Sequence, residues 1–357
     1  MSGTARRLGL VGLLAAAALW LLIAVPTPFV VYEPGLAAPL EPIVSVESGD
    51  EPGKGTFYLT TVKMSSVDSF WSAFRSAWSG DRELYRKKDV LGGQSMEEFA
   101  EKLRFAMQGS QTAAIEAAYR TAGVAYDIVP ERLVVTDSRD PDAALRAGDI
   151  IWSADGDAVR SAAALAAALS DRQAGDSVVF SVERAGVRTQ VKVRLAAGAG
   201  GEADPEALAA ALGGVGLTEL RRIEPLQPGN KVTIAAEGIG GPSAGLMFAL
   251  QIYDLLTDGD LTGGIKVAGT GTIDAEGKIG AVGGTAYKVA AAARAGAGLF
   301  LAPEANYDEA EAKARALGGA MKVIPVATLA DAIRELEAQP GGPPAPESGG
   351  QTVTGRR

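Results

Sequence analysis

The stretch GGPSAG at residues 240–245 is followed directly by the apolar run LMFALQIYDLL at 246–256. Glycines and a proline favour a tight turn, and the apolar run favours a buried helix that begins right after it. Ser243 therefore lies where the chain enters a helix, and the backbone N–H groups of a first helical turn have no acceptor within the helix. Such groups can stabilise the oxyanion that forms when a serine attacks an acyl group. The alternative is a Gly-rich turn in which Ser243 only caps the helix.

A second stretch, VAGTGTIDAEGKIGAVGGTAYKVAAAARAGA at 267–297, offers a base for this serine. It is predicted to form two short strands joined by a turn at 274–277, and Gly284 then leads into an Ala-rich helix. Lys288 lies in the first turn of that helix, where the helix dipole disfavours a cation and small neighbours permit burial. Both effects lower the pKa of an amine and favour the neutral form, which can act as a general base. An exposed lysine at a helix start is the ordinary alternative.

The composition narrows the chemistry further. The 357 residues include neither cysteine nor histidine, and the formal net charge is −9. A thiol nucleophile, a His-dependent triad and the usual zinc ligand sets are therefore excluded, and an acidic chain does not favour nucleic-acid binding. There is no G-x-x-x-x-G-K-[ST] motif for a phosphate-binding loop. We predict no metal and no cofactor.

The N-terminus carries a hydrophobic run, LGLVGLLAAAALWLLIAV at 8–25. These 18 residues would span about 27 Å as a helix, enough with the apolar continuation to residue 32 to cross a bilayer core of about 30 Å. Arg6 and Arg7 precede the run and acidic residues follow it, which predicts a cytoplasmic N-terminus and a body outside the cytoplasm. We therefore assign 1–32 to a transmembrane anchor in the cell membrane. A cleaved signal peptide is the alternative, and it would export the body as well.

The rest of the chain divides into four predicted regions. Residues 33–123 are predicted as a linker or extended lead-in at 33–55, rich in Pro, Gly and acids, then a strand at 56–64 and helices at about 66–78 and 95–121. The last helix starts with Ser95-x-x-Glu98, a capping-box pattern. Three regions follow: a compact β-rich module at 124–196, one α/β domain at 205–337, and a tail at 338–357 whose composition indicates disorder.

The module at 124–196 resembles a PDZ domain. The resemblance rests on Gly148-Asp149-Ile150-Ile151 followed by Asp155-Gly156, and on a helix that precedes a final strand hairpin. Such domains bind a peptide as an added strand beside the helix. Gly123-Val124 is the nearest candidate for a carboxylate-binding loop. The alternative is that the module only spaces the catalytic domain from the membrane.

The region 205–337 resembles the proteolytic domain of the Lon protease family. Pro-Ser-Ala-Gly around Ser243 matches the nucleophile motif of the family, Thr270-Gly271 matches a strand beside the active site, and Gly283-Gly284-x-x-x-Lys288 matches the lysine motif. Ser243 and Lys288 are 45 residues apart, close to the family spacing. The whole architecture is similar to bacterial membrane-anchored Lon-like proteases with a PDZ domain, the YlbL type. The AAA+ ATPase of Lon is absent from this chain.

The resemblance implies roles for the residues of this site. Lys288 would accept the proton of Ser243, Thr270 would orient Lys288, and backbone N–H groups from Gly241 to Ala244 would hold the oxyanion. Pro242 would help to shape the loop.

Other polar residues are given lesser roles. Glu237 is a further polar candidate near the loop. Asp274 is predicted as a turn residue, and three other lysines are predicted to face solvent: Lys231, Lys266 and Lys278.

The predicted function is that of an ATP-independent serine endopeptidase of α/β (α+β) fold, which acts on unfolded or extended protein segments outside the cytoplasm. The PDZ-like domain would bind substrate or gate the site, and the resemblance to Lon implies a hexameric ring. A catalytically silent PDZ scaffold at the membrane is the main alternative, although the intact serine and lysine motifs favour the enzyme. A general acylase or esterase would share the same dyad chemistry.

Overall fold

The computed structural model describes residues 10–16, 20, 27–49, 53–67, 69–78, 82–138, 143–198 and 204–339. The predicted anchor, residues 1–32, is described only at 10–16, which are helical, at Trp20 and at 27–32. Among the described residues, no helix is long and apolar enough to cross a membrane. The predicted disordered tail lies outside the described residues from position 340 onward.

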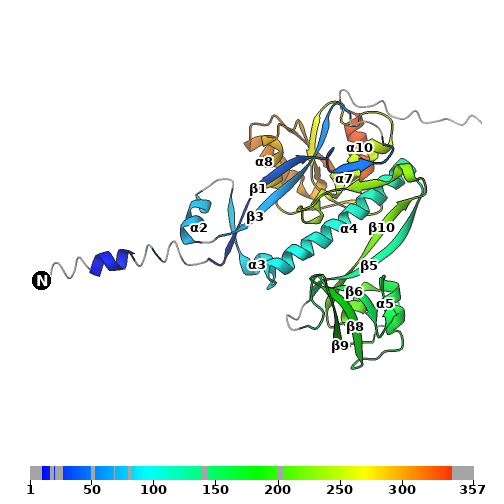
Figure 1. The fold of residues 1–357 in the computed structure, drawn as a ribbon. Coiled ribbons are helices and arrows are strands. Elements are labelled where there is room, and N and C mark those ends of the chain that lie inside the picture. The colour runs from blue at the N-terminus through cyan, green and yellow to red at the C-terminus, as the bar shows by residue number, and fades with distance from the viewer. Residues whose placement is uncertain are drawn as a thin grey trace, which may run out of the picture.

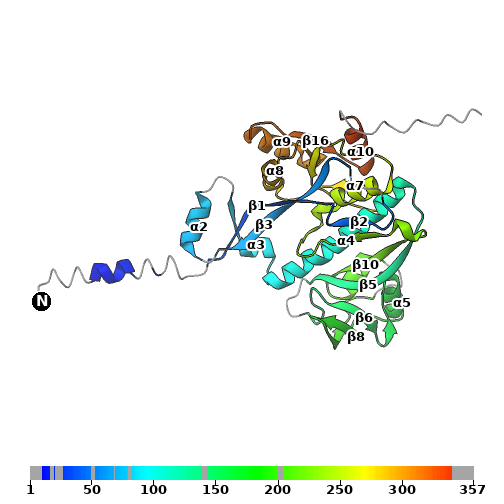
Figure 2. The ribbon, with the colours of Figure 1, turned by 45° about the horizontal axis from the view of Figure 1, so that its top comes forward.

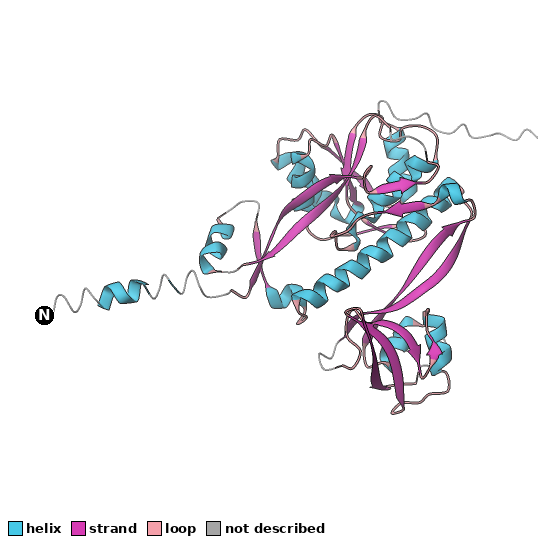
Figure 3. Cartoon of the chain, viewed as in Figure 1, coloured by secondary structure: helices cyan, strands magenta, loops and turns pink. Residues whose placement is uncertain are grey.

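A six-stranded sheet forms the centre of the larger body (Figures 1 and 3). Its strands, in spatial order, are β16 (Lys322–Val326), β15 (Leu299–Pro303), β12 (Lys266–Gly269), β3 (Thr56–Ser66), β1 (Phe29–Pro39) and β4 (Glu83–Arg86). The first four are parallel, whereas β1 is antiparallel to β3 and to β4. Residues that precede the PDZ-like module therefore complete the sheet of the C-terminal region.

Helices cover both faces of this sheet, because successive side chains of a strand point to opposite sides. Phe57 and Leu59 of β3 pack with one set of helices, whereas Tyr58 packs on the opposite side. The first face is covered by α4 (Met96–Ala122), α7 (Gly245–Leu256) and α10 (Leu329–Glu337), and the second by α8 (Thr285–Arg294) and α9 (Tyr307–Ala316). The result is a three-layer α/β/α body.

The second sheet forms the smaller body, drawn in green in Figure 1. Its strands, in spatial order, are β10 (Val215–Pro225), β5 (Tyr126–Ser138), β6 (Ile150–Ala154), β8 (Ser177–Arg184) and β9 (Val187–Arg194), with β7 (Asp157–Ala158) paired to β6. The predicted hairpin is confirmed: Ala185 and Gly186 connect β8 to β9 with φ angles of 50° and 77°. Helix α5 (Ala162–Leu169) packs on this sheet.

Short elements complete the described residues. They are β2 (Val44–Val46) paired with β11 (Val232–Ile234), β13 (Thr272–Ile273) paired with β14 (Ile279–Gly280), α2 (Phe70–Ala77), α3 (Lys87–Leu91), α6 (Pro205–Ala211), and the 3-10 helices η1 (Pro228–Asn230), η2 (Pro242–Ala244) and η3 (Glu304–Asn306).

Three predicted boundaries are wrong. The start of the C-terminal domain at 205 fails because Leu208 and Val215 lie in the hydrophobic core of the smaller body, and β10 pairs with β5 along its whole length. The anchor predicted to reach residue 32 is too long, because residues 29–32 belong to β1 and pair with β4. The segment 33–55, predicted as a linker or extended lead-in, contains the rest of β1 and β2. The helix expected from residue 66 begins at Phe70, because β3 continues to Ser66.

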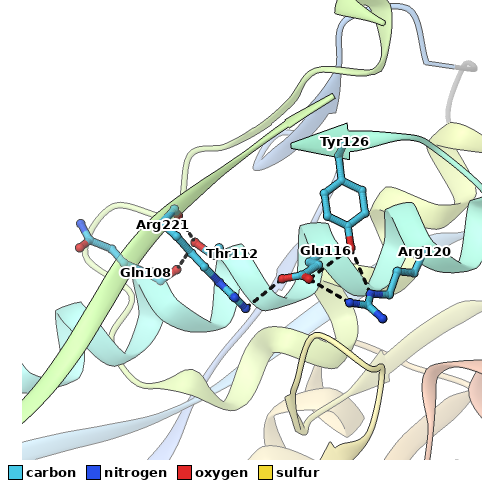
Figure 4. Close-up of polar contacts among 6 residues, drawn as sticks. All are labelled: Gln108, Thr112, Glu116, Arg120, Tyr126 and Arg221. Atoms are coloured by element: carbon cyan, nitrogen blue, oxygen red, sulfur yellow. Dashed lines mark hydrogen bonds and ion pairs between the residues drawn. The ribbon is translucent and has the colours of Figure 1, made fainter. Parts of the chain in front are cut away.

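Helix α4 connects the two bodies (Figure 2). Ser95 and Glu98 form the predicted capping box at its start. Near its other end, the carboxylate of Glu116, with a side chain only 2% exposed, lies 3.3 Å from Arg120 and 2.9 Å from Arg221 of β10 (Figure 4). The hydroxyl of Tyr126 on β5 donates to the same carboxylate at 3.2 Å. The β5–β10 ribbon is thereby held against α4.

Candidate active site

The loop that carries Ser243 is shaped by glycines. Gly241 has a φ of 88°, a conformation that side chains with a Cβ rarely adopt, and η2 begins at the next residue. A Cβ on Gly245 would lie 2.6 Å from Oγ of Ser110 and 2.8 Å from Cγ2 of Ile273. Only glycine therefore lets the first turn of α7 pack so closely against α4 and β13. Ser243 lies in η2, directly before this turn.

Ser243 and Lys288 are brought into direct contact. The Nζ atom of Lys288 lies 2.5 Å from Oγ of Ser243 and 2.8 Å from Oγ1 of Thr270. Lys288 lies one turn into α8, and the residue is only 3% exposed. The structure therefore brings these three predicted side chains together.

Thr270 fixes the direction of the hydrogen bonds among these three side chains. Its hydroxyl donates to the carbonyl oxygen of Ser243 at 3.0 Å, so its oxygen can only accept from the amine of Lys288. An N–H of a neutral Lys288 then points to Thr270, which leaves the nitrogen lone pair free to face the hydroxyl of Ser243. The N–H of Gly271 donates to the same carbonyl of Ser243 at 2.9 Å, which fixes the serine backbone to the strand segment.

The pKa of Lys288 is lowered from 10.5 to about 7 by burial. Removal from water disfavours the charged ammonium and leaves a large neutral fraction at neutral pH. The sequence predicts that both the helix dipole and burial lower the pKa of Lys288. In the structure, burial is the cause of the lowered pKa. A buried amine with a pKa near neutrality, in contact with a hydroxyl, is suited to remove its proton.

Helix α4 lies over the serine loop, an arrangement that sequence reasoning missed. The carbonyl oxygen of Leu103 accepts the N–H of Gly241 at 2.9 Å, and the hydroxyl of Ser110 donates to the carbonyl of Pro242 at 2.7 Å. Leu103 contacts the loop through its backbone, which leaves no pattern in the side chains. The only side chain that could have indicated this contact is Ser110, a buried polar residue of α4.

These contacts change the expected set of oxyanion donors. The N–H of Gly241 is already bonded to Leu103, and Pro242 has no N–H. In the 3-10 helix η2, the i→i+3 pattern pairs the N–H of Ala244 with the carbonyl of Gly241, whereas the N–H of Ser243 has no acceptor within the helix. Gly241 and Pro242 therefore shape the loop in this structure, Ala244 belongs to the helical hydrogen bonding, and the N–H of Ser243 is the candidate for binding an oxyanion.

The remaining predicted polar residues lie outside this cluster. Glu237 is exposed, and Asp274 forms the expected turn by accepting the N–H of Lys278 at 2.7 Å. The three lysines expected to face solvent are exposed. Within the described part of the chain, no group of acidic side chains is arranged to hold a metal ion.

Gly123-Val124, the nearest candidate for a carboxylate-binding loop, forms the end of helix α4 instead. Gly123 ends α4 in the left-handed conformation, with a φ of 71°, and the N–H of Val124 donates to the carbonyl of Tyr119 at 2.8 Å. This is the usual glycine termination of a helix. The edge strands of the sheet in the smaller body are β10 and β9. The side chain of Leu208 on α6 is fully buried in the core of this body, beside α5 and β10.

Comparisons with known proteins fit both bodies. Residues 232–338 match the family model described as the Lon protease (S16) C-terminal proteolytic domain, and residues 119–195 match that of the PDZ domain. The chain is 32% identical to a Lon protease of Neorickettsia sennetsu over 93 residues, which cover 26% of this chain and 11% of that protein. It is also 32% identical to a Lon protease of Trichlorobacter lovleyi over 114 residues, which cover 32% of this chain and 14% of that protein.

Among solved structures, the PDZ domain of an SdrC-like protein from Listeria monocytogenes is 23% identical and covers 25% of this chain and 86% of that chain, with a TM-score of 0.19. The family matches confirm the predicted pairing of a PDZ domain with a Lon-type proteolytic domain. The similarity to the two Lon proteases is limited to 11% and 14% of their length.

Proposed function

We propose that this chain, which carries a PDZ domain and a serine peptidase domain of the Lon type, cleaves peptide bonds with Ser243 as nucleophile and Lys288 as general base. The observation that carries the proposal is the 2.5 Å contact between Nζ of Lys288 and Oγ of Ser243. Burial supports it, because the lowered pKa of Lys288 supplies a neutral amine near neutral pH.

The first half-reaction transfers the acyl group to the enzyme. Lys288 takes the proton of Ser243 while Oγ forms a bond to the substrate carbonyl carbon. The N–H of Ser243 stabilises the oxyanion, and Thr270 keeps the lone pair of Lys288 directed at Oγ. The ammonium of Lys288 then gives its proton to the leaving amine as the C–N bond breaks. An acyl-enzyme ester on Ser243 and a neutral Lys288 remain.

The second half-reaction returns the enzyme to its starting state. Neutral Lys288 takes a proton from water, and the hydroxide formed attacks the ester carbonyl. When the C–Oγ bond breaks, the ammonium of Lys288 returns the proton to Ser243. Each proton that Lys288 accepts is thus released within the same half-reaction, and the reaction consumes only the peptide and one water.

We further propose that cleavage needs no ATP and acts on unfolded or extended segments. The chain has no phosphate-binding loop motif, so nothing in it would pull a folded substrate apart. The PDZ domain would bind such segments or gate their entry. Lys288 is buried, and the glycines around Ser243 would let an extended backbone approach the hydroxyl closely.

The cellular setting is part of the same proposal. The apolar run at 8–25, with Arg6 and Arg7 before it, would anchor the chain in the cell membrane and place both domains outside the cytoplasm. Resemblance to the Lon family supports assembly into a homo-oligomer, with a hexameric ring as the expected form.

The alternative is a catalytically silent PDZ scaffold. The intact contact between Ser243 and Lys288 argues against it, because a decayed site has no reason to keep a buried, costly lysine against its serine. A general acylase would use the same chemistry, and it would hydrolyse simple esters without cutting polypeptides.

The deciding experiment is cleavage of an intrinsically unstructured protein by the full chain in detergent, with and without ATP. The controls are Ser243→Ala and Lys288→Met, each checked for native fold and oligomeric state. If only the unmutated chain cuts, equally with and without ATP, the proposal stands. If all three cut equally, the dyad assignment is wrong. If none cuts polypeptide, ester hydrolysis by the unmutated chain alone would identify an acylase, and no hydrolysis would favour the scaffold.

A soluble version for the same assay must begin before Thr27. The hydroxyl of Thr27 donates to the carbonyl of Val67 at 2.6 Å, and residues 29–32 form the whole pairing of β1 with β4. A chain that starts at residue 33 would lose these contacts.

A further inference from the structure

Helix α2 presents a stripe of large aromatic side chains to solvent. Trp71, Phe74 and Trp78 are 58%, 58% and 83% exposed, and they follow one another at three- and four-residue spacing. Their rings are adjacent: the centroids of Trp71 and Phe74 are 6.0 Å apart, and those of Phe74 and Trp78 are 6.1 Å apart. We call these three residues the aromatic stripe. Single exposed apolar residues are ordinary on protein surfaces, but three adjacent, exposed aromatic rings on one helix face are a candidate binding surface.

The opposite face of α2 is firmly held. Ala73 is buried against Val31 of β1 and Val67, and Ser76 is buried as well. Ser69 and Ser72 form a capping box at the start of the helix. The aromatic stripe is therefore displayed by a fixed helix, and no rotation of α2 can bury it against its own body without exposing this packed face.

The position of α2 points to what covers the stripe. Figures 1 and 2 both show α2 at the far end of the β1–β3 ribbon, away from the PDZ sheet. Phe29, the first residue of β1, packs in the same small core as Ala73 of α2. The apolar run at 8–25 ends four residues before Phe29, and four residues span at most about 14 Å. A bilayer that holds this run must lie close to α2.

We propose that α2 lies on the membrane surface, with the aromatic stripe inserted at the level of the lipid headgroups. This rests on the membrane anchor proposed above. Tryptophan is enriched at membrane–water interfaces, because its ring is apolar and its N–H remains able to hydrogen bond. An eight-residue helix with one aromatic face and one packed face fits an interfacial position and is far too short to span a bilayer.

Charge contributes little to this contact. Arg75 is exposed beside the stripe, but the nearby β4 and α3 segment carries exposed acids, Glu83 and Asp89, as well as exposed bases, Arg86 and Lys88. A surface of mixed sign has no strong preference for anionic lipid. Burial of the aromatic rings is the main source of attraction, so zwitterionic lipid is sufficient as a probe.

The four tryptophans of the chain make the test direct, because each reports on one region: Trp20 on the anchor, Trp71 and Trp78 on α2, and Trp152 on the PDZ domain. The full chain is reconstituted into phosphatidylcholine vesicles, either unlabelled or brominated on the acyl chains near the headgroup. Bromine quenches tryptophan emission only on contact. Three variants with Trp→Phe substitutions retain only Trp20, only Trp71 and Trp78, or only Trp152.

The expected result is that the variant with Trp71 and Trp78 loses at least as large a fraction of its emission as the variant with Trp20. The variant with Trp152 is the matched control and should lose none, because its ring lies under the guanidinium of Arg188 on the PDZ sheet, at 4.2 Å. Phenylalanine keeps each site apolar, and native fold is checked by circular dichroism.

The other outcomes separate this inference from the anchor. If Trp20 is quenched but Trp71 and Trp78 are not, the anchor stands and the membrane contact of α2 is wrong. A blue-shifted but unquenched emission from α2 would assign the stripe to a second copy of this chain and would equally overturn the proposal. If α2 is quenched and Trp20 is not, the surface contact holds without the anchor. If neither is quenched, both proposals fail.

Discussion

The carbonyl oxygen of Leu103 accepts the N–H of Gly241 at 2.9 Å, so the first third of the long helix α4 is bonded to the loop that carries Ser243. Helix α4 also connects this loop to the PDZ body, because Glu101 on the same stretch lies against Gly148 of that body. The shape of the serine loop is therefore set by an element that reaches both domains. Any motion of α4 would be transmitted to the N–H of Ser243 that would bind the oxyanion.

Ser110→Ala should weaken this connection in a measurable way. The substitution removes the hydrogen bond to the carbonyl of Pro242, which is worth about 1 kcal/mol of unfolding free energy, and loosens the loop beside Ser243. We expect kcat to fall while KM changes little. Thr121→Ala is the matched control, because its hydroxyl bonds only within α4, to Ala117. Equal kcat values for the two variants would show that α4 does not shape the site.

The rate of acylation should rise with pH and level off above about 7. Burial lowers the pKa of Lys288 to about 7, and only the neutral amine can take the proton of Ser243. Well below this pKa the rate should fall about tenfold per pH unit, because the neutral fraction falls in that proportion. The measurement is single-turnover acylation, in which product release does not limit the rate. A flat profile on both sides of neutral pH would rule out Lys288 as the base.

Thr270→Val should lower kcat on the order of tenfold, about the value of one buried hydrogen bond of 1.5 kcal/mol. Without the hydroxyl oxygen, no acceptor holds the N–H of Lys288, and the lone pair is no longer directed at Ser243. Thr270→Ser keeps the hydroxyl and should restore most of the activity. The pH profile separates this role from a structural one, since Thr270→Val should also move the apparent pKa of the base. An unchanged profile with simple loss of stability would contradict a positioning role.

The local motifs of the site could be read from the sequence, because each is contained in a short segment. The glycine-shaped turn before α7 and the lysine at the start of α8 follow from residue types and spacing alone. Their mutual contact was expected only through family resemblance, since no short-range pattern brings Ser243 to Lys288.

The domain boundaries could not be read in the same way, because they depend on long-range pairing. β10 pairs with β5, whose residues lie 77 to 99 positions earlier in the chain, and its alternating apolar residues would suit either domain equally well. β1 was hidden in a Pro- and Gly-rich segment, yet it pairs with β3 along most of its length. The contact of Leu103 with Gly241 uses a backbone carbonyl, which every residue has, so no sequence pattern could reveal it.

The stability of the fold should rise between pH 7 and pH 10.5 through Lys288. Its folded pKa, about 7, lies below its ordinary value of 10.5, so the unfolded chain binds more protons in this window. The free energy of unfolding therefore increases with pH there, and the penalty for burying Lys288 is fully present below pH 7. Lys288→Met removes this group and should be more stable at pH 7 by a few kcal/mol, on the order expected for a large pKa shift.

The test is urea unfolding of both proteins at a series of pH values, with the difference between them as the readout. Subtraction removes the titration of the groups that the two proteins share. The advantage of Lys288→Met should shrink as pH rises. A difference that does not change with pH would mean that Lys288 is not destabilised by burial.

Glu116→Gln should loosen the attachment of the PDZ body to α4. The carboxylate is buried and paired with Arg120 and Arg221, whose side chains are half-exposed, so the arginines can return to water while the new amide keeps part of the hydrogen bonding. Hydrogen bonds to charged groups contribute about 1.5–3 kcal/mol, and we expect a loss of unfolding free energy near the lower end of that range. Hydrogen exchange should quicken in β5 and β10 and stay unchanged in β12 and β15, because the contacts of Glu116 join only the β5–β10 ribbon to α4.

Glu311→Gln is the control. Glu311 pairs with Arg315 on the surface of α9, and its substitution should change the free energy of unfolding by less than about 0.5 kcal/mol. If exchange instead quickened equally in both sheets, Glu116 would stabilise the whole fold and would have no special part in holding the two bodies together.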